Sequence, residues 1–194
     1  MGNTVSNVTA GKPNPAGAIY RAPVGTTLPT NTEALDTTKW VCLGFCSEDG
    51  VKNSGEMDSE NIKAWGGQTV LTTASSTDDT FNFKLIEVLS DEVKKFIYGD
   101  SNVSGNLTDG IAVGVSGYSQ ESSSIVIDMI MRDNAKHRVV IPSATIAEVG
   151  EIEYTDGDAV GYDVTLSCAA DGSGKTHYEY TKRVPSTSIV PIGG

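Results

Sequence analysis

The sequence lacks the features that membrane proteins and disulfide-stabilised secreted proteins require. None of its hydrophobic runs approaches the roughly 18 apolar residues of a membrane-spanning helix, and its first residues, MGNTVSNVTAGK, contain no apolar signal region. It has only 3 cysteines, and an odd number without a secretory signal argues for reduced thiols. We therefore expect a protein that stays in the cytosol of the cell that makes it, with no membrane partner.

Motifs for catalysis and for cofactor or metal binding are also missing. Cys42 and Cys46 resemble a ligand pair, but four residues of a strand span roughly 13 Å, so we interpret both as small core or half-buried residues. His137 and His177 have no triad signature and no third metal ligand, and we expect them at the surface of strands. Residues 172–176, GSGKT, match the end of a phosphate-binding loop, but HYEYTKR follows with the alternation of a strand, which predicts a hairpin turn. We predict no catalytic residue, no cofactor and no metal.

Positive charge is scarce as well. The chain has 14 Lys+Arg against 25 Asp+Glu, a net charge of −11. A surface of this sign repels nucleic acid, which excludes an ordinary DNA-binding protein. Acidity for solubility alone remains an alternative interpretation.

The residues that are present favour one all-β domain. A length of 194 residues, 38% hydrophobic content and 21 glycines are typical of a turn-rich globular chain. Alternating apolar residues between turn-rich pieces predict a β-sandwich or a barrel-like fold. The predicted strands cover residues 18–22, 40–47, 56–64, 69–74, 80–88, 111–117, 123–132, 137–141, 145–154, 159–169 and 176–183.

One stretch, Thr80–Gly99, changes from the period of a strand to that of a helix. Its first residues, TFNFKL, alternate apolar and polar side chains. Ser90 is placed to cap a helix, acidic residues follow in the first turn, and Gly99 can end the helix with a positive φ. The sequence thus predicts one short helix, attached to the sheet by an apolar stripe of Val93, Phe96 and Ile97.

The two ends of the chain and one internal segment show no periodicity. We expect a flexible N-terminal arm over residues 1–17, the domain over residues 18–183 and a C-terminal arm over residues 184–194. The segment Ser47–Glu60 is too polar for a core, and we expect a long loop or hairpin there.

Several segments, read in order over residues 18 to 182, resemble the major tail tube protein of long-tailed bacteriophages. The resemblance is carried by RAPVGTTLPT, KWVCLGFCSEDGV, IKAWGGQTV, the strand and helix of Thr80–Gly99, and EVGEIEYTDGDAVGYDVTLS. It implies a β-sandwich or barrel-like subunit that forms rings, usually hexamers, stacked into the hollow tube through which DNA leaves the capsid.

The resemblance also implies a structural, non-enzymatic role in the virion, with assembly in the host cytoplasm. The implied partners are further copies of the chain and the tape measure, tail tip and terminator proteins, while genomic DNA passes without specific binding. A wall without basic charge suits such a conduit, because it offers DNA no counterion-release gain. Two alternatives stay open: another ring-forming tube protein of the type VI secretion kind, and a carbohydrate-binding or adhesive β-sandwich, against which the aromatic content of only 7% argues.

We expect subunit contacts through the arms, the Ser47–Glu60 segment and the helix. The candidate interface residues are Ser47, Glu48, Asp49, Val51, Glu56, Met57, Phe96, Ile189, Val190 and Ile192. The span Thr145–Val164 carries carboxylates without Lys or Arg. Either it is a solvated acidic edge or part of it faces the tube lumen, for which the candidates are Glu151, Glu153 and Asp156.

Overall fold

The fold is mostly β, in a computed structural model that describes residues 8–15 and 17–183. It contains one α-helix, α1 (Asp91–Tyr98), and the 3-10 turns Asp100–Asn102 and Arg132–Asn134. The prediction of an all-β fold with one short α-helix is confirmed. The strands are β1 (Gly11–Pro13), β2 (Ile19–Pro23), β3 (Val41–Cys42), β4 (Cys46–Lys63), β5 (Thr69–Leu85), β6 (Val103–Asn106), β7 (Gly110–Val113), β8 (Ser123–Met131), β9 (Ala135–Val149), β10 (Tyr162–Cys168) and β11 (Tyr178–Arg183).

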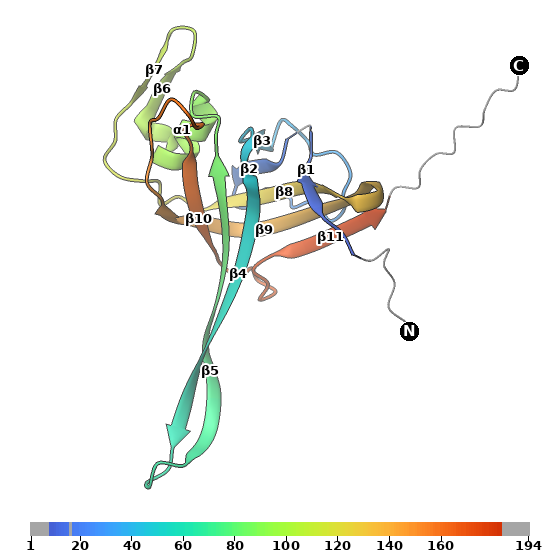
Figure 1. The fold of residues 1–194 in the computed structure, drawn as a ribbon, viewed down its shortest axis with the longest axis vertical. Helices are drawn as coiled ribbons and strands as arrows, with labels where there is room; N and C mark the ends of the chain where they lie inside the picture. Colours follow the sequence, from blue (N-terminus) through green and yellow to red (C-terminus); the bar gives the residue numbers. More distant parts are fainter. Residues whose placement is uncertain (1–7, 16, 184–194) are drawn as a thin grey trace, which may run out of the picture.

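The strands form one antiparallel sheet that curls on itself (Figure 1). Its order is β3-β2-β8-β9-β10-β5-β4, with β1 added to β8 and β11 added to β9, and β6 and β7 form a separate hairpin. The link between β3 and β4 joins the two ends of this order: the Leu43 N–H donates to the Ile19 carbonyl in β2 (2.8 Å), and the Ile86 N–H after β5 donates to the Phe45 carbonyl (3.0 Å). The sheet is therefore closer to a barrel than to two separate packed sheets.

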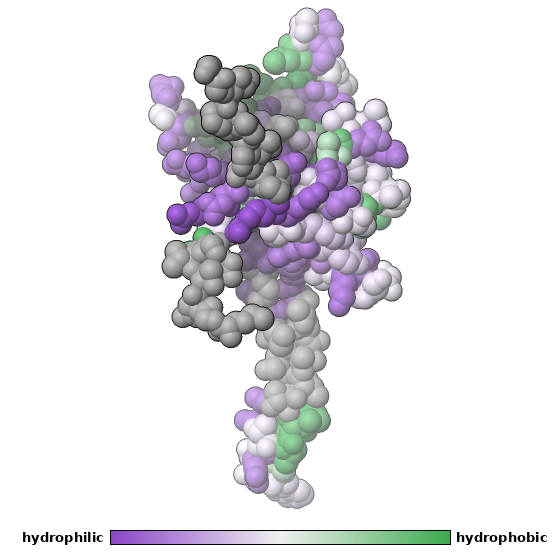
Figure 2. All heavy atoms as spheres, turned by 90° about the vertical axis from the view of Figure 1, so that its right-hand side faces the viewer, coloured by the Kyte–Doolittle hydropathy of each residue, from purple (hydrophilic) through white to green (hydrophobic). Residues whose placement is uncertain are grey.

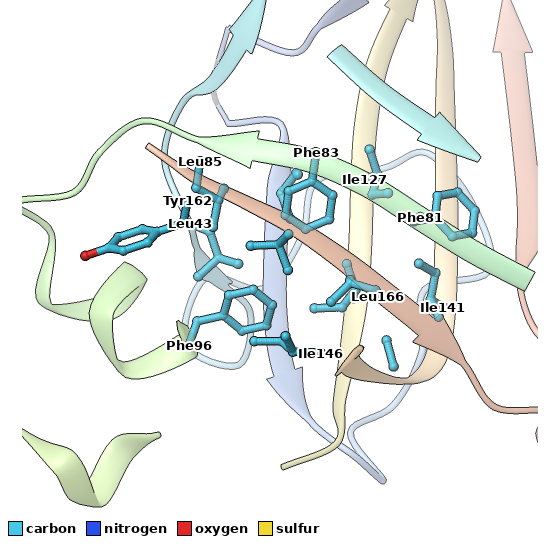
Figure 3. Packing of buried hydrophobic residues seen from close by; sticks show 14 of the residues in the cluster. Leu43, Phe81, Phe83, Leu85, Phe96, Ile127, Ile141, Ile146, Tyr162 and Leu166 are labelled. Atoms are coloured by element: carbon cyan, nitrogen blue, oxygen red, sulfur yellow. The ribbon is translucent and has the colours of Figure 1, made fainter. Parts of the chain in front are cut away.

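The interior of the barrel is the main hydrophobic core. Figure 3 shows aromatic and aliphatic side chains from β5, β8, β9, β10 and α1 pointing toward one another. Along β10, the predicted alternation is confirmed, because Val164, Leu166 and Cys168 are buried and Asp163 and Ser167 are exposed. The largest fully buried side chains include Phe83, Leu43, Leu85, Ile97, Ile125, Ile127, Ile141 and Leu166.

The helix closes one side of this core as the sequence predicts. Ser90 Oγ accepts a hydrogen bond from the Val93 N–H, and Gly99 ends the helix with a φ of +95°. Val93, Phe96 and Ile97 are its buried residues.

A second, smaller core covers the outer face of the barrel. Residues 24–40 lie over this face, where Trp40 packs with Tyr20, Val126 and Val140. Arg138 ties residues 24–40 to the barrel. Its Nε and Nη2 donate to the carboxylate of Asp128 in β8 at 2.6 and 2.7 Å, and its Nη1 donates to the carbonyl of Asn31 in the covering segment at 2.9 Å.

Several predicted boundaries are wrong. Residues 47–60, expected as a long loop or hairpin, belong to the long strand β4, one arm of a hairpin with β5, and the two strands expected over 69–74 and 80–88 are one strand, β5. The strands expected over 137–141 and 145–154 are likewise the single strand β9. Part of the expected N-terminal arm, Gly11–Pro13, pairs with β8.

Candidate functional site and assembly surfaces

The hairpin of β4 and β5 extends far beyond the barrel (Figure 1). β10 accompanies β5 only as far as Ser167 opposite Thr80, whereas the β4–β5 ladder continues to Lys63 opposite Thr69. Beyond Thr80 the hairpin is a two-stranded ribbon with no third strand from the described residues. We call residues 54–79 the ribbon; its roughly ten residues per strand, at about 3.3 Å each, extend about 33 Å.

The end of the ribbon, residues 61–71, is apolar and exposed, and we call it the hairpin tip. Gly66 and Gly67 turn the chain there with φ of +116° and +91°, values that favour glycine. Figure 2 shows the resulting apolar surface in green. Contiguous apolar surface on a soluble protein marks an interaction site. The large apolar side chains of the tip are Ile62 (49% exposed), Trp65 (107%), Val70 (60%) and Leu71 (52%).

The root of the ribbon is tied to the start of β11 by a buried carboxylate, Asp79. Asn53 in β4 donates to Asp79 through Nδ2 (2.7 Å), and His177 Nδ1 lies 2.5 Å from Asp79 Oδ2. The His177 ring also packs edge-on against Phe81. Burial alone would raise the pKa of Asp79, but hydrogen bonds from Thr176, Asn53 and His177 outweigh burial and hold the pKa below its usual value. The contacts tie the root of the ribbon to the residues that precede β11.

Both histidines differ from the exposed strand positions that the sequence predicts. His177 is half-buried and precedes β11, and His137 is half-buried in β9, where Nδ1 lies 2.7 Å from Thr181 Oγ1. A turn forms at GSGKT, where Gly174 has a φ of +72° and its N–H donates to the Asp171 carbonyl, but the predicted hairpin is wrong because β10 and β11 both pair with β9. No group of three metal-binding side chains converges among residues 8–15 and 17–183.

The three cysteines are free thiols in different environments. Cys42 is exposed, contrary to the expectation of a core or half-buried residue, whereas Cys46 is half-buried as predicted, and Cys168 is buried. The strand that should separate Cys42 from Cys46 is interrupted at Gly44, which has a φ of +78°. Burial, with a further contribution from Cys42, raises the pKa of the Cys46 thiol to about 12.

An acidic groove of about 290 Å³ lies beside the first residues of β4. The ladder with β5 is interrupted between Cys46 and Val51, so the chain bulges there and aims its polar side chains outward. These residues meet the loop before β10, and the groove contains one Lys, Lys84. The carboxylates that line it are Glu48, Asp49, Glu153 and Asp158.

The structure thus brings together two groups of residues that lie about a hundred positions apart in the sequence. Ser47, Glu48 and Asp49 from the predicted interface and Glu153 from the predicted lumen line the same groove. Glu151 and Asp156 are exposed on the same loop.

The other predicted interface residues are scattered. Glu56 is exposed on the ribbon and Met57 follows it in β4, whereas Val51 is half-buried against the main core. Phe96 is only 5% exposed in that core, so its assignment to an interface is wrong: its ring holds α1 to the sheet. Ile189, Val190 and Ile192 lie outside the described residues.

The hairpin tip was missed as an interaction surface. Its signal is the segment IKAWGGQTVL, in which a Gly-Gly turn joins two short runs that contain large apolar residues and no carboxylate. A hairpin turn with a large aromatic residue beside it is an exposed position by geometry alone.

Comparison with known proteins assigns the family. A family model described as phage tail tube protein matches residues 2–187, which include the barrel, α1 and the whole ribbon. A search of curated proteins found no match. The described residues contain no helix that is long and apolar enough to cross a membrane. The mostly β fold with one helix agrees with the family, which is structural and not enzymatic, and the chain therefore belongs to the phage tail tube proteins.

Proposed function

We propose that this protein is the major subunit of its tail tube, and that its copies form rings, hexameric as the family resemblance implies, which stack into the channel for DNA ejection. The observation that carries the proposal is the ribbon with its exposed apolar tip. Such a surface has no use in a monomer, and it lies far enough from the barrel to reach a neighbouring ring.

The physical chemistry of the ribbon supports assembly. A two-stranded hairpin is marginally stable in water unless a further strand or another surface covers it. Among the described residues β4 and β11 pair on one side only, and edges of this kind invite pairing with another chain. Neighbouring subunits in a ring would supply that cover.

The carboxylates of the loop before β10 suggest how the tube wall would interact with DNA. If Glu151, Glu153 and Asp156 face the channel, they repel the phosphates of passing DNA at every ring. DNA then moves through the tube without specific binding. The same carboxylates on the outside of the tube would serve solubility only.

A stack of rings has two different ends, because the ribbon leaves the barrel in one direction (Figure 1). One end of the tube would present hairpin tips and the other end the opposite side of the barrels. Different tail proteins are therefore required to complete the two ends, which fits a terminator at one end and a tail tip at the other. A tape measure would occupy the lumen during assembly in the host cytoplasm.

Electron microscopy of the purified protein over a range of concentrations tests the proposal. We expect uniform tubes or rings from the unmodified protein, and loss of tubes when Ile62, Trp65 and Leu71 are together replaced by serine. A matched control, Val24→Ser, changes an exposed apolar residue of the barrel, 52% exposed, and should leave the tubes intact. A chain that stays monomeric at all concentrations and salts would contradict the proposal and favour an adhesive β-sandwich.

A further inference from the structure

A second apolar surface lies at the opposite end of the molecule from the hairpin tip. It is an open groove of about 720 Å³ where the end of β5, the start of α1, the β6–β7 turn and the loop before β10 meet. We call it the distal groove. Its apolar lining includes Val88, Leu89, Leu107 and Val160, of which Leu89 and Leu107 are 63% and 65% exposed. Figure 1 places β6, β7 and α1 far from the end of the ribbon.

We propose that the distal groove receives the hairpin tip of a second copy of this chain in the next ring. The proposal rests on the proposed function, because it needs rings that stack. A contact between two different surfaces of identical subunits is heterologous, and it propagates into a filament when the two surfaces lie at opposite ends. The tip and the distal groove satisfy this geometric requirement.

Charge complementarity favours the distal groove as the receiving surface. The tip, residues 61–71, contains Lys63 and no carboxylate, although the whole chain has a net charge of −11. The distal groove carries Glu87 and Asp91; Asp91 Oδ2 is already paired with Lys95 Nζ at 2.8 Å, which leaves Glu87 as the carboxylate for a new contact. A Lys63 ammonium beside Glu87 would be attracted.

The carboxylate of Glu87 is held in position for such a contact. Its Oε1 accepts a hydrogen bond from the Phe45 N–H at 2.8 Å. A side chain at position 44 would collide with this carboxylate, because a Cβ there would lie 2.3 Å from the Glu87 carboxyl carbon. Gly44 therefore lets Glu87 sit against the backbone, at a fixed place in the groove wall.

The tip would act as an anchor rather than as the whole contact between rings. A stable interface buries about 800 Å² on each partner, more than four apolar side chains provide, and the facing sides of the rings must supply the rest. Within such an interface a Trp in an apolar pocket is the residue type that contributes most. Trp65 is the only Trp of the tip.

Disulfide trapping in assembled tubes tests the proposal. In a Cys42→Ser background, which removes the exposed thiol, Trp65→Cys is combined with Leu107→Cys or, in a second variant, with Leu89→Cys. Each chain then carries a tip thiol and a groove thiol, so oxidised tubes should give a ladder of cross-linked chains that continues beyond the number of subunits in a ring. Trp65→Cys with Ser173→Cys, an exposed residue of the β10–β11 turn, is the control and should give no ladder.

The outcomes separate this inference from the proposed function. If the tubes form but neither groove thiol cross-links, or if the ladder stops at the ring size, the distal groove does not receive the tip of the next ring and the inference fails, while the tube function stands. If the unmodified protein forms no tubes, the proposed function fails instead.

A charge pair provides an independent test if the cysteine variants do not assemble. Leu107→Asp should leave rings intact and abolish stacking, and adding Leu71→Lys should restore tubes, because the docked tip would bring a positive charge into the groove that holds the new carboxylate. Tubes formed by Leu107→Asp alone at the level of the unmodified protein would overturn the inference, as would a failure of Leu71→Lys to restore them.

Discussion

His177 and Asp79 join the last described strand of the chain to the root of the ribbon. His177 Nδ1 lies 2.5 Å from Asp79 Oδ2, and the Asp79 side chain is 8% exposed. A carboxylate this buried is tolerated only when donors surround it, and here Asn53, Thr176 and His177 are the donors.

We predict that Asp79 makes stability depend on acidic pH. Its pKa is lower in the folded state than in the unfolded chain, so its contribution is present above the unfolded value of about 3.9 and is lost as the pH falls through the folded value. Asp79→Asn should therefore lower the free energy of unfolding at pH 7 by about 1 to 3 kcal/mol, with the difference shrinking toward pH 2. Urea unfolding at several pH values measures this.

The neighbouring residue offers a matched control for that experiment. Asp78 is exposed, and Asp78→Asn should change the free energy of unfolding by less than about 0.5 kcal/mol at any pH. Equal effects of the two substitutions would show that the buried contacts of Asp79 contribute nothing specific.

We predict that Phe96→Ala detaches α1 from the barrel. The ring is 5% exposed in the main core, and removing a buried Phe costs about 3 to 5 kcal/mol. For a chain of this size the thermal midpoint should fall by roughly 6 to 20 °C, at about 2 to 4 °C per kcal/mol. Leu89→Ala, next to the same helix but exposed, is the control. An unchanged midpoint for Phe96→Ala would contradict the role of the ring in the core.

We predict that the Arg138 and Asp128 pair is costly to break but replaceable as a unit. Arg138→Met leaves the buried Asp128 carboxylate without its two guanidinium donors, which should lower the free energy of unfolding by about 3 to 5 kcal/mol. Adding Asp128→Leu removes the unpaired charge and should recover part of that loss. Chemical denaturation of the single and double variants measures both steps, and a double variant less stable than Arg138→Met would refute the prediction.

The sequence predicts elements whose signals are local. The helix is predicted correctly because Ser90, the acidic first turn and Gly99 satisfy its ends within ten residues or so. β10 is predicted correctly because one of its faces is buried and the other faces solvent, so apolar and polar residues alternate along the strand.

The sequence predicts a long loop or hairpin over residues 47–60 and separate strands over 56–64 and 69–74, but not the single long β4–β5 ladder. Asp78, exposed in β5, lies between two predicted strands, whereas Glu56, exposed opposite it in β4, begins the predicted strand 56–64. These residues form strands because their backbones pair across the hairpin. Each pairing partner lies about twenty residues away in the sequence. The distal groove is missed for a related reason, since Leu89 and Leu107 meet only through the tertiary fold.

The last prediction concerns the acidic loop before β10. Glu151, Glu153 and Asp156 are exposed, and replacing all three with lysine should leave folding and tube assembly intact, because exposed charges contribute little to stability. If the loop lines the lumen, each ring then presents lysines to the phosphates, and DNA is held by counterion release at every step. Particles with these tails should eject DNA more slowly, with a defect that shrinks as salt rises.

A control variant is needed to distinguish the effect of charge in the channel from the effect of total surface charge. The control replaces three exposed carboxylates outside the acidic loop and the ribbon, Glu33, Glu121 and Glu179, with lysine, which changes the net charge equally. We expect this variant to eject DNA at the rate of the unmodified phage. Equal ejection rates for the two variants in low salt would place the acidic loop on the outer surface of the tube. The net charge of −11 would then serve solubility and not the passage of DNA.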